Sequence, residues 1–190
     1  MRNILAVFMT MILLTAGGSA WAASPRVKME TSMGVIELEL APHRAPRTVE
    51  NFLQYVNDGF YDGTIFHRVI KGFMIQGGGM TEDMVEKRTR EPIPNEADNG
   101  LKNRRGSIAM ARTGDPHSAT AQFFINTVDN LPLDFQSETM QGWGYCVFGR
   151  VVRGMEVVSA IEDVETGRKG GYQDVPRQTV VIKKATVIMP

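Results

Sequence analysis

The feature that most constrains this chain is a series of short β-rich runs that follow one another closely. The runs are rich in β-branched and aromatic residues, and Gly, Pro, Asn and Asp separate them. They lie at residues 64–70, 73–76, 107–111, 122–127 and 146–152. Their spacing leaves little room for the crossover helices that parallel neighbours require. The pattern therefore predicts a mostly β fold whose strands close into a barrel.

Segments near the N-terminal end of this series predict a hairpin and a helix. Residues 26–40 alternate between apolar and polar side chains around a turn at Met33-Gly34, as in a β-hairpin. Pro46 then begins an apolar pattern of helical period, and Gly59 follows it as a stop signal. We expect this helix to pack on the barrel by one face.

The C-terminal part predicts a second helix and a last strand. An amphipathic segment begins after Gly154, with Val157, Ile161 and Val164 on one face, and an apolar run closes the chain at residues 179–188. Two further stretches, residues 77–105 and 165–178, have the composition of long surface loops, which often carry function. No internal repeat or second domain is indicated.

The first 22 residues have the pattern of a secretory signal peptide. Arg2 precedes an uncharged apolar run that is too short for a membrane span, and Ala20-Trp21-Ala22 offers small residues at a cleavage site. We therefore expect a signal peptide at residues 1–22 and one domain at residues 23–190, with no stable membrane insertion after cleavage. The alternatives are an uncleaved anchor or a buried N-terminal helix.

Charge and cysteine content exclude several classes of function. The chain has 21 basic and 21 acidic residues, so removing residues 1–22, which contain Arg2 and no acid, leaves a formal charge of −1. Such a balance does not attract nucleic acid. The single cysteine, Cys146, cannot form an internal disulfide, and its apolar neighbours predict a buried thiol rather than a nucleophile.

Motifs for metal, phosphate and hydrolytic chemistry are missing from the sequence. The three histidines are far apart, and no GxSxG elbow occurs. The run at residues 77–79 lacks the Lys-Ser/Thr of a phosphate loop, so it predicts a turn. The cluster Asn103-Arg104-Arg105 is interpreted as a solvated loop. We expect no metal and no cofactor.

One arginine does not fit a purely structural interpretation. Arg68 is a permanent cation within an apolar strand, and arginine is rarely buried without a partner. Strand alternation places Met74 and Gln76 on one face, and likewise Gln122 and Phe124. Composition alone leaves a structural ion pair, an exposed arginine and a binding site all open.

Four ordered blocks resemble the signature of the cyclophilin family. They lie at residues 66–70, 72–78, 106–111 and 121–125, and agreement extends through residues 145–149. The chain is most similar to single-domain bacterial forms, including forms with a signal peptide. The resemblance implies a closed eight-stranded antiparallel barrel capped by two α-helices. It also implies a monomeric, cofactor-independent peptidyl-prolyl cis-trans isomerase in the periplasm, acting on proline-containing unfolded or exported polypeptides.

The resemblance also assigns roles to residues. Arg68 matches the catalytic arginine, which donates a hydrogen bond to the proline nitrogen, and Gln76 orients it. The backbone N–H of Arg112 is expected to hold the carbonyl oxygen. The substrate-binding residues implied in this way are Phe73, Met74, Ala111, Arg112, Gln122, Phe124, Leu133 and Tyr145.

Three positions depart from the family pattern. Arg112 replaces an asparagine, Tyr145 replaces a histidine, and Pro132 replaces an aromatic residue that helps to wall the groove. We expect weak inhibition by cyclosporin from Pro132 and Tyr145. The departure at Pro132 also motivates an alternative function, a peptide-binding chaperone or scaffold with little catalysis. A third possibility, a barrel that binds a small apolar ligand inside, is weakened because small barrels fill their interior with side chains.

Overall fold

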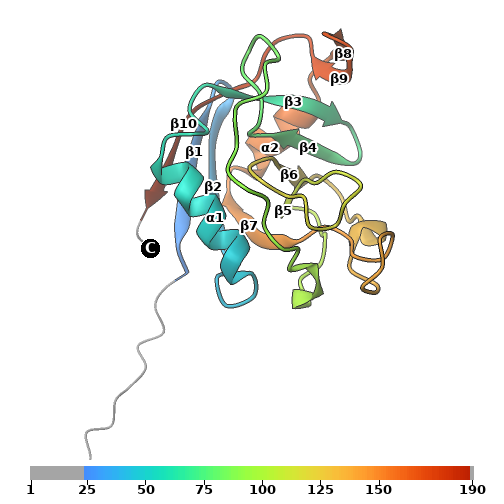
Figure 1. Ribbon diagram of the computed structural model, residues 1–190. Helices are drawn as coiled ribbons and strands as arrows, with labels where there is room; N and C mark the ends of the chain where they lie inside the picture. The colour runs from blue at the N-terminus through green and yellow to red at the C-terminus, as the bar shows by residue number, and fades with distance from the viewer. Residues whose placement is uncertain (1–23, 189–190) are drawn as a thin grey trace, which may run out of the picture.

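Eight antiparallel strands close into a barrel in the computed structural model, which describes residues 24–188 (Figure 1). The order around the barrel is β1-β10-β3-β4-β6-β5-β7-β2, so the predicted fold class is confirmed. The strands are β1 (Arg26–Thr31), β2 (Gly34–Leu40), β3 (Thr64–Ile70), β4 (Met74–Gly77), β5 (Ser107–Met110), β6 (Phe123–Asn126), β7 (Val147–Arg153) and β10 (Val181–Ile188). The predicted signal peptide at residues 1–22 lies outside the described residues.

Side-chain alternation along the strands builds the core. In the hairpin of β1 and β2, Val27 pairs with Leu38 and Met29 pairs with Ile36, and all four side chains are fully buried. The intervening charged residues point outward, as the two-residue period of a strand requires. Each barrel strand therefore contributes one face to a common interior.

Aromatic rings fill the centre of that interior. The ring of Phe52 lies 5.1 Å from Phe148, 5.2 Å from Tyr61 and 5.8 Å from Phe123, measured between centroids. Offset and edge-on pairs of this kind are favourable beyond the area that they bury. These side chains occupy the space that a ligand inside the barrel would need.

Two helices pack against the barrel, α1 (Pro46–Asn57) in front of it and α2 (Met155–Glu162) behind it in Figure 1. Val158 and Ile161 of α2 are fully buried. The predicted apolar face is thus present, although Val157 is only partly buried. No helix among residues 24–188 is long and apolar enough to cross a membrane.

The N-terminus of α1 is capped by a distant acidic residue. Ala45, at the N-cap position, has no side-chain acceptor for the first free N–H groups. Glu96 supplies it: its carboxylate accepts from the backbone N–H of Arg47 at 3.1 Å and of Thr48 at 2.8 Å, and from the Thr48 hydroxyl at 2.7 Å. The loop before β5 is thereby joined to the helix.

Two predictions about turns and loops were wrong in detail. The first turn lies at residues 32–33, and Gly34 already belongs to β2. The segment at residues 165–178 is a hairpin of β8 (Thr166–Lys169) and β9 (Tyr172–Pro176), because Gly170 and Gly171 adopt the positive φ angles of a tight turn. The loop at residues 77–105 contains a 3-10 turn, Ala97–Asn99.

We expect Glu96→Ala to lower the free energy of unfolding by about 1–2 kcal/mol, the usual cost of losing a helix cap that also carries a favourable charge. Urea titration followed by circular dichroism measures this change. Glu91→Ala removes an exposed carboxylate from the same loop and serves as the matched control. Equal effects of the two substitutions would contradict a capping role for Glu96.

Candidate functional site

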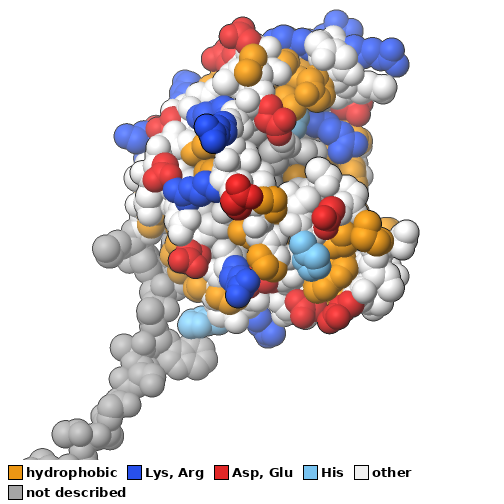
Figure 2. Space-filling model, in the orientation of Figure 1, with side chains coloured by type: hydrophobic (Ala, Val, Ile, Leu, Met, Phe, Trp, Pro, Cys, Tyr) orange, Lys and Arg blue, Asp and Glu red, His pale blue; other side chains and the backbone are white. Residues whose placement is uncertain are grey.

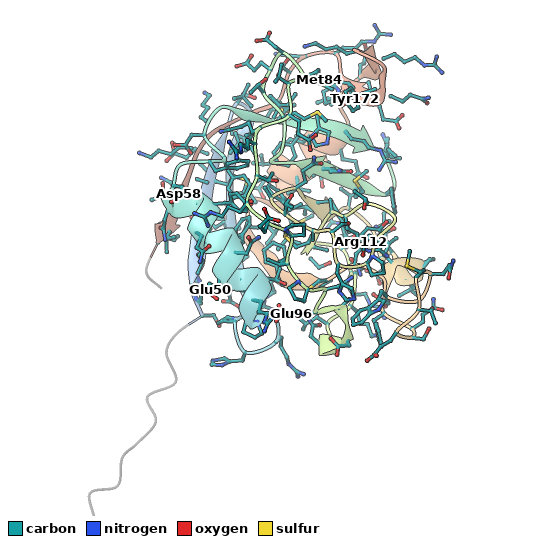
Figure 3. All side chains as sticks on the ribbon, viewed as in Figure 1. Glu50, Asp58, Met84, Glu96, Arg112 and Tyr172 are labelled. Atoms are coloured by element: carbon teal, nitrogen blue, oxygen red, sulfur yellow. The ribbon has the colours of Figure 1, made fainter. Side chains whose placement is uncertain are left out.

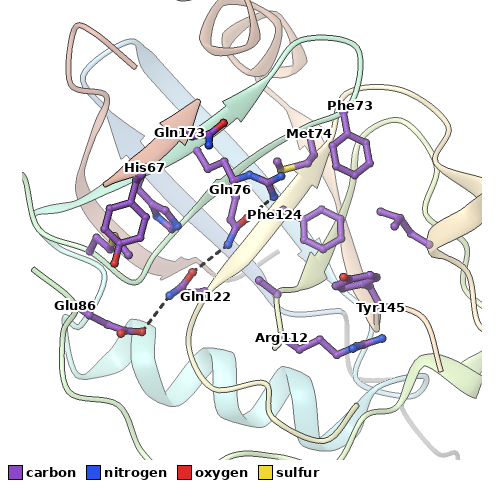
Figure 4. Close-up of a pocket in the computed structure, with 15 residues that line it drawn as sticks. His67, Phe73, Met74, Gln76, Glu86, Arg112, Gln122, Phe124, Tyr145 and Gln173 are labelled. Atoms are coloured by element: carbon purple, nitrogen blue, oxygen red, sulfur yellow. Dashed lines mark hydrogen bonds between the residues drawn. The ribbon is translucent and has the colours of Figure 1, made fainter. Parts of the chain in front are cut away.

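A groove with a volume of about 630 Å³ lies on the outer face of β3, β4 and β6 and beside the segment that follows β5 (Figure 4). It brings together every residue that the sequence assigned to the site. These residues are Arg68, Phe73, Met74, Gln76, Ala111, Arg112, Gln122, Phe124, Leu133 and Tyr145. Figure 2 shows the molecular surface hollowed in this region.

Strand register sets the centre of the groove. Arg68 in β3 pairs with Gln76 in β4, and Gln76 pairs with Phe124 in β6. Side chains that are directly opposite in neighbouring antiparallel strands project from the same face. The cation, the amide and the aromatic ring are therefore held in one row, with Arg68 Nη1 donating to Gln76 Oε1 at 3.5 Å.

A β-bulge brings a second residue of β3 to the groove. The register with β4 shifts between Phe66 and Arg68, so His67 lies within the bulge and lines the groove beside Arg68. Its side chain is only 4% exposed, and its Nδ1 atom is buried without a hydrogen-bond partner among residues 24–188. The pKa of His67 is lowered to about 4, mainly by burial and to a smaller extent by the nearby charge of Arg68.

One half of the groove is apolar. Met74 and Phe124 are almost fully buried at its base, and the ring of Tyr145 meets Phe124 edge-on with centroids 5.5 Å apart. Phe73 and Leu133 are partly buried against this cluster. The arrangement offers an apolar hollow next to the guanidinium of Arg68.

A buried network of amide side chains ties together the two sides of this hollow. Asn130 donates from Nδ2 to the Phe73 carbonyl at 2.8 Å and to Asn126 Oδ1 at 2.6 Å. Asn126 donates to Asn103 Oδ1 at 3.1 Å, and Asn103 donates to the Leu133 carbonyl at 3.1 Å. Asn103 is fully buried, so interpreting it as part of a solvated loop was wrong. Buried amides require such partners.

Arg112 contributes in a way that the sequence did not indicate. Its side chain folds along the groove, where Nε donates to the Gly144 carbonyl at 2.9 Å and the guanidinium lies 4.6 Å from the Tyr145 ring centroid. No hydrogen bond within residues 24–188 uses its backbone N–H. That N–H therefore stays available to an acceptor in the groove.

Pro132, which departs from the family pattern, lies on the surface of the protein. It lies in a 3-10 turn, Leu131–Leu133, and its side chain is exposed to solvent. Leu133 and Tyr145 form this side of the groove instead. The expected weak inhibition by cyclosporin stays a prediction.

Sequence reasoning missed the far end of the groove. There Met80 and Glu86 come from the loop after β4, and Tyr172 and Gln173 come from β9. The side chain of Lys169 donates to the backbone carbonyl of Glu82 at 2.9 Å and so joins this loop to the hairpin. Figure 3 labels Met84 of this loop and Tyr172 of this hairpin in the same region of the view. No local pattern in either segment predicts that they meet.

The groups present limit the chemistry of the site. No three His, Cys, Asp or Glu side chains lie close enough to hold a metal ion within residues 24–188. Cys146 is buried, as predicted, and burial raises its pKa to about 12. The groove therefore offers the guanidinium groups of Arg68 and Arg112, the carboxylate of Glu86, amide groups and an apolar hollow. Such a mixture of polar groups and an apolar hollow suits a segment of polypeptide.

Comparison with known proteins agrees with this geometry. Residues 26–187 match the family described as "Cyclophilin type peptidyl-prolyl cis-trans isomerase/CLD". Peptidyl-prolyl cis-trans isomerase cyp18 from Streptomyces antibioticus is 62% identical over 162 residues, or 85% of this chain and 98% of the relative. Peptidyl-prolyl cis-trans isomerase B from Escherichia coli is 60% identical over 161 residues, again 85% and 98% of the two chains.

Two further proteins extend the comparison. Peptidyl-prolyl cis-trans isomerase A from Dickeya dadantii is 53% identical over 189 residues and is covered to 98%, as is this chain. A cyclophilin-type isomerase from Cryptosporidium parvum, solved in the presence of the dipeptide Ala-Pro, superimposes with a TM-score of 0.71 at 27% identity. That alignment covers 87% of this chain and 99% of the other.

We expect His67 to make the protein less stable as the pH falls from 6.5 towards 4. In this window the unfolded chain binds a proton at His67 and the folded chain does not, so the free energy of unfolding falls by up to about 3 kcal/mol. Urea titrations of wild type and His67→Phe at pH 7.5 and pH 4.5, values chosen to span roughly this window, isolate the contribution.

His43→Gln, which changes an exposed histidine, is the control. The wild type and His43→Gln are expected to lose more stability between the two pH values than His67→Phe does. The same loss in all three proteins would rule out His67 as the source.

Proposed function

Because the chain belongs to the cyclophilin-type peptidyl-prolyl cis-trans isomerase family, we propose that Arg68 catalyses rotation about the X-Pro peptide bond. We also propose that the substrates are exported, unfolded polypeptides. The protein is a peptidyl-prolyl cis-trans isomerase with a closed antiparallel barrel. The observation that carries the residue assignment is the apolar hollow of Met74 and Phe124 directly beside the guanidinium of Arg68.

The reaction needs binding energy rather than a nucleophile. Rotation about an X-Pro bond crosses a barrier of about 18–20 kcal/mol because twisting removes amide resonance, and it takes roughly tens to hundreds of seconds without a catalyst. No bond is made or broken. A catalyst must therefore hold the twisted amide more tightly than either planar form.

Arg68 is suited to recognise the twisted amide. The nitrogen of a planar amide is a poor hydrogen-bond acceptor, and twisting localises its lone pair. A guanidinium donor placed at this nitrogen is therefore bound more strongly in the transition state than in the ground state. We propose that the proline ring enters the hollow of Phe73, Met74, Phe124 and Leu133, which directs the nitrogen towards Arg68.

Two neighbouring groups complete the proposed mechanism. Gln76 accepts a hydrogen bond from Arg68 and so limits the rotation of its long side chain. The backbone N–H of Arg112 is proposed to hold the carbonyl oxygen of the residue before proline. Accelerating the exchange from about 0.01 per second to 10–1,000 per second requires roughly 4–7 kcal/mol. One charged hydrogen bond of about 1.5–3 kcal/mol and a rigid pocket are of this order.

The alternative is peptide binding without useful catalysis, and it rests on Pro132. Exposure of Pro132 leaves the side chains of Leu133 and Tyr145 as the wall of the hollow on this side. A wall of this kind still encloses a proline ring, and the guanidinium of Arg68 beside the hollow supports catalysis over binding alone. A location in the periplasm is proposed on the predicted signal peptide, and the monomeric state stays a prediction.

Arg68→Ala is expected to reduce kcat/KM for a proline peptide by about 10- to 150-fold, the equivalent of one charged hydrogen bond of 1.5–3 kcal/mol. The Arg68 side chain is exposed, so the variant should unfold at the same urea concentration as wild type. A protease-coupled isomerisation assay measures the loss, and Arg88→Ala, a nearby exposed arginine, is the control. Undiminished turnover in Arg68→Ala would refute the assignment.

Export is tested on the full-length chain with a C-terminal tag. Expression in a Gram-negative host is expected to give periplasmic protein whose mass corresponds to a start at Ala23. Ala22→Pro should block cleavage and leave the precursor uncleaved. Recovery of wild type in the cytoplasm with residues 1–22 intact would refute the proposed localisation.

A further inference from the structure

Four side chains form a continuous hydrogen-bonded relay across the groove (Figure 4). Arg68 Nη1 donates to Gln76 Oε1 at 3.5 Å, Gln76 Nε2 donates to Gln122 Oε1 at 3.0 Å, and Gln122 Nε2 donates to Glu86 Oε1 at 3.3 Å. The relay begins at a cation and ends at a carboxylate. Glu86 lies on the loop after β4, outside the segments that formed the predicted site.

The two ends of the relay determine its direction. A guanidinium can only donate, and an ionised carboxylate can only accept. Glu86 therefore requires the NH₂ end of Gln122, which leaves the Gln122 oxygen for Gln76. The oxygen of Gln76 is then the atom that faces Arg68. If both amides were reversed, the NH₂ group of Gln76 would face the donors of Arg68, and neither end could bond.

We propose that Glu86 is a positioning residue for Arg68, acting through Gln122 and Gln76. This inference rests on the proposed role of Arg68 in the reaction. Glu86 fixes the orientation of both amides, and the oxygen of Gln76 thereby holds the guanidinium in one position beside the apolar hollow. Arg68 has no ion pair of its own within residues 24–188, so the relay is its electrostatic support.

The loop that carries Glu86 is built to hold it in place. Met80 and Glu86 form an antiparallel bridge, and the backbone N–H of Lys87 donates to the Gly79 carbonyl at 2.9 Å. The side chain of Lys87 anchors the same segment to the barrel, because its Nζ donates to the Phe60 carbonyl and lies 4.6 Å from the Phe60 ring centroid. The side chain of Glu86 is exposed, yet its backbone is held by the bridge to Met80 and by the hydrogen bond of the neighbouring Lys87.

Close packing at Gly79 holds the middle of the relay. A Cβ atom at Gly79 would lie 2.3 Å from Cγ of Gln122 and 2.7 Å from its Nε2. Only glycine leaves room for the Gln122 side chain to lie flat against this backbone. The same short segment thus supports Gln122 by contact and Glu86 by backbone pairing.

The test is a graded series of substitutions at Glu86. Gln can still present an oxygen, Ala presents nothing, and Lys presents only donors and so opposes the native direction. We expect kcat/KM for a proline peptide to fall in the order wild type, Glu86→Gln, Glu86→Ala, Glu86→Lys, with a roughly two- to tenfold loss for Glu86→Ala and unchanged KM. The exposed residue Asp83, on the same loop, provides the controls Asp83→Ala and Asp83→Lys.

A double-mutant cycle separates positioning from a general effect of charge. In a Gln122→Met background the relay is already broken, so Glu86→Ala should cause no further loss. The side-chain amide signals of Gln76 and Gln122 in ¹⁵N spectra should shift in Glu86→Ala and not in Asp83→Ala. Equal losses in the Asp83 controls, or a full additional loss in the Gln122→Met background, would overturn the proposal.

The two hypotheses fail in different ways. If Arg68→Ala keeps its turnover, the role of Arg68 is wrong whatever Glu86 does. If Arg68→Ala loses turnover and Glu86→Ala does not, only the positioning role of Glu86 is overturned.

Discussion

The pairing of β4 with both β3 and β6 is the constraint on which the site depends. It places Arg68, Gln76 and Phe124 opposite one another without any loop between them. A shift of one residue in either register would turn these side chains towards the core. The aromatic interior prevents such a shift, because the alternate residues of the same strands, Phe123 among them, must stay buried. Core packing thus also determines the geometry of the groove.

The barrel and most of the groove could be predicted because their signals are local. Alternation identified the strands, and Pro46 and Gly59 marked the first helix. The rest depends on contacts that no local pattern reports. His67 reaches the groove through a bulge, Tyr172 through a hairpin in a segment whose composition predicts a loop, and Glu86 through the folding of a long connection. Asn103 was misjudged because its two basic neighbours are exposed while its own amide is buried.

The groove has a buried apolar half and an exposed charged half, and the two halves have different roles. Met74 and Phe124 are buried and determine the shape of the hollow, whereas Arg68 and Glu86 are exposed and provide charge. An exposed charge is screened by water until a substrate covers it. Binding of a polypeptide across the groove would therefore strengthen the same hydrogen bonds that hold Arg68 in place.

The buried asparagines have a consequence for how this surface can change. Phe73 and Leu133 both line the hollow, and their backbone carbonyls accept hydrogen bonds from Asn130 and Asn103 of one buried network. The width of the opening is therefore fixed inside the protein, away from the residues that a substrate meets. Substitutions at exposed positions such as Pro132 can therefore change which residues beside the proline are recognised. The width of the pocket that receives the proline ring stays the same.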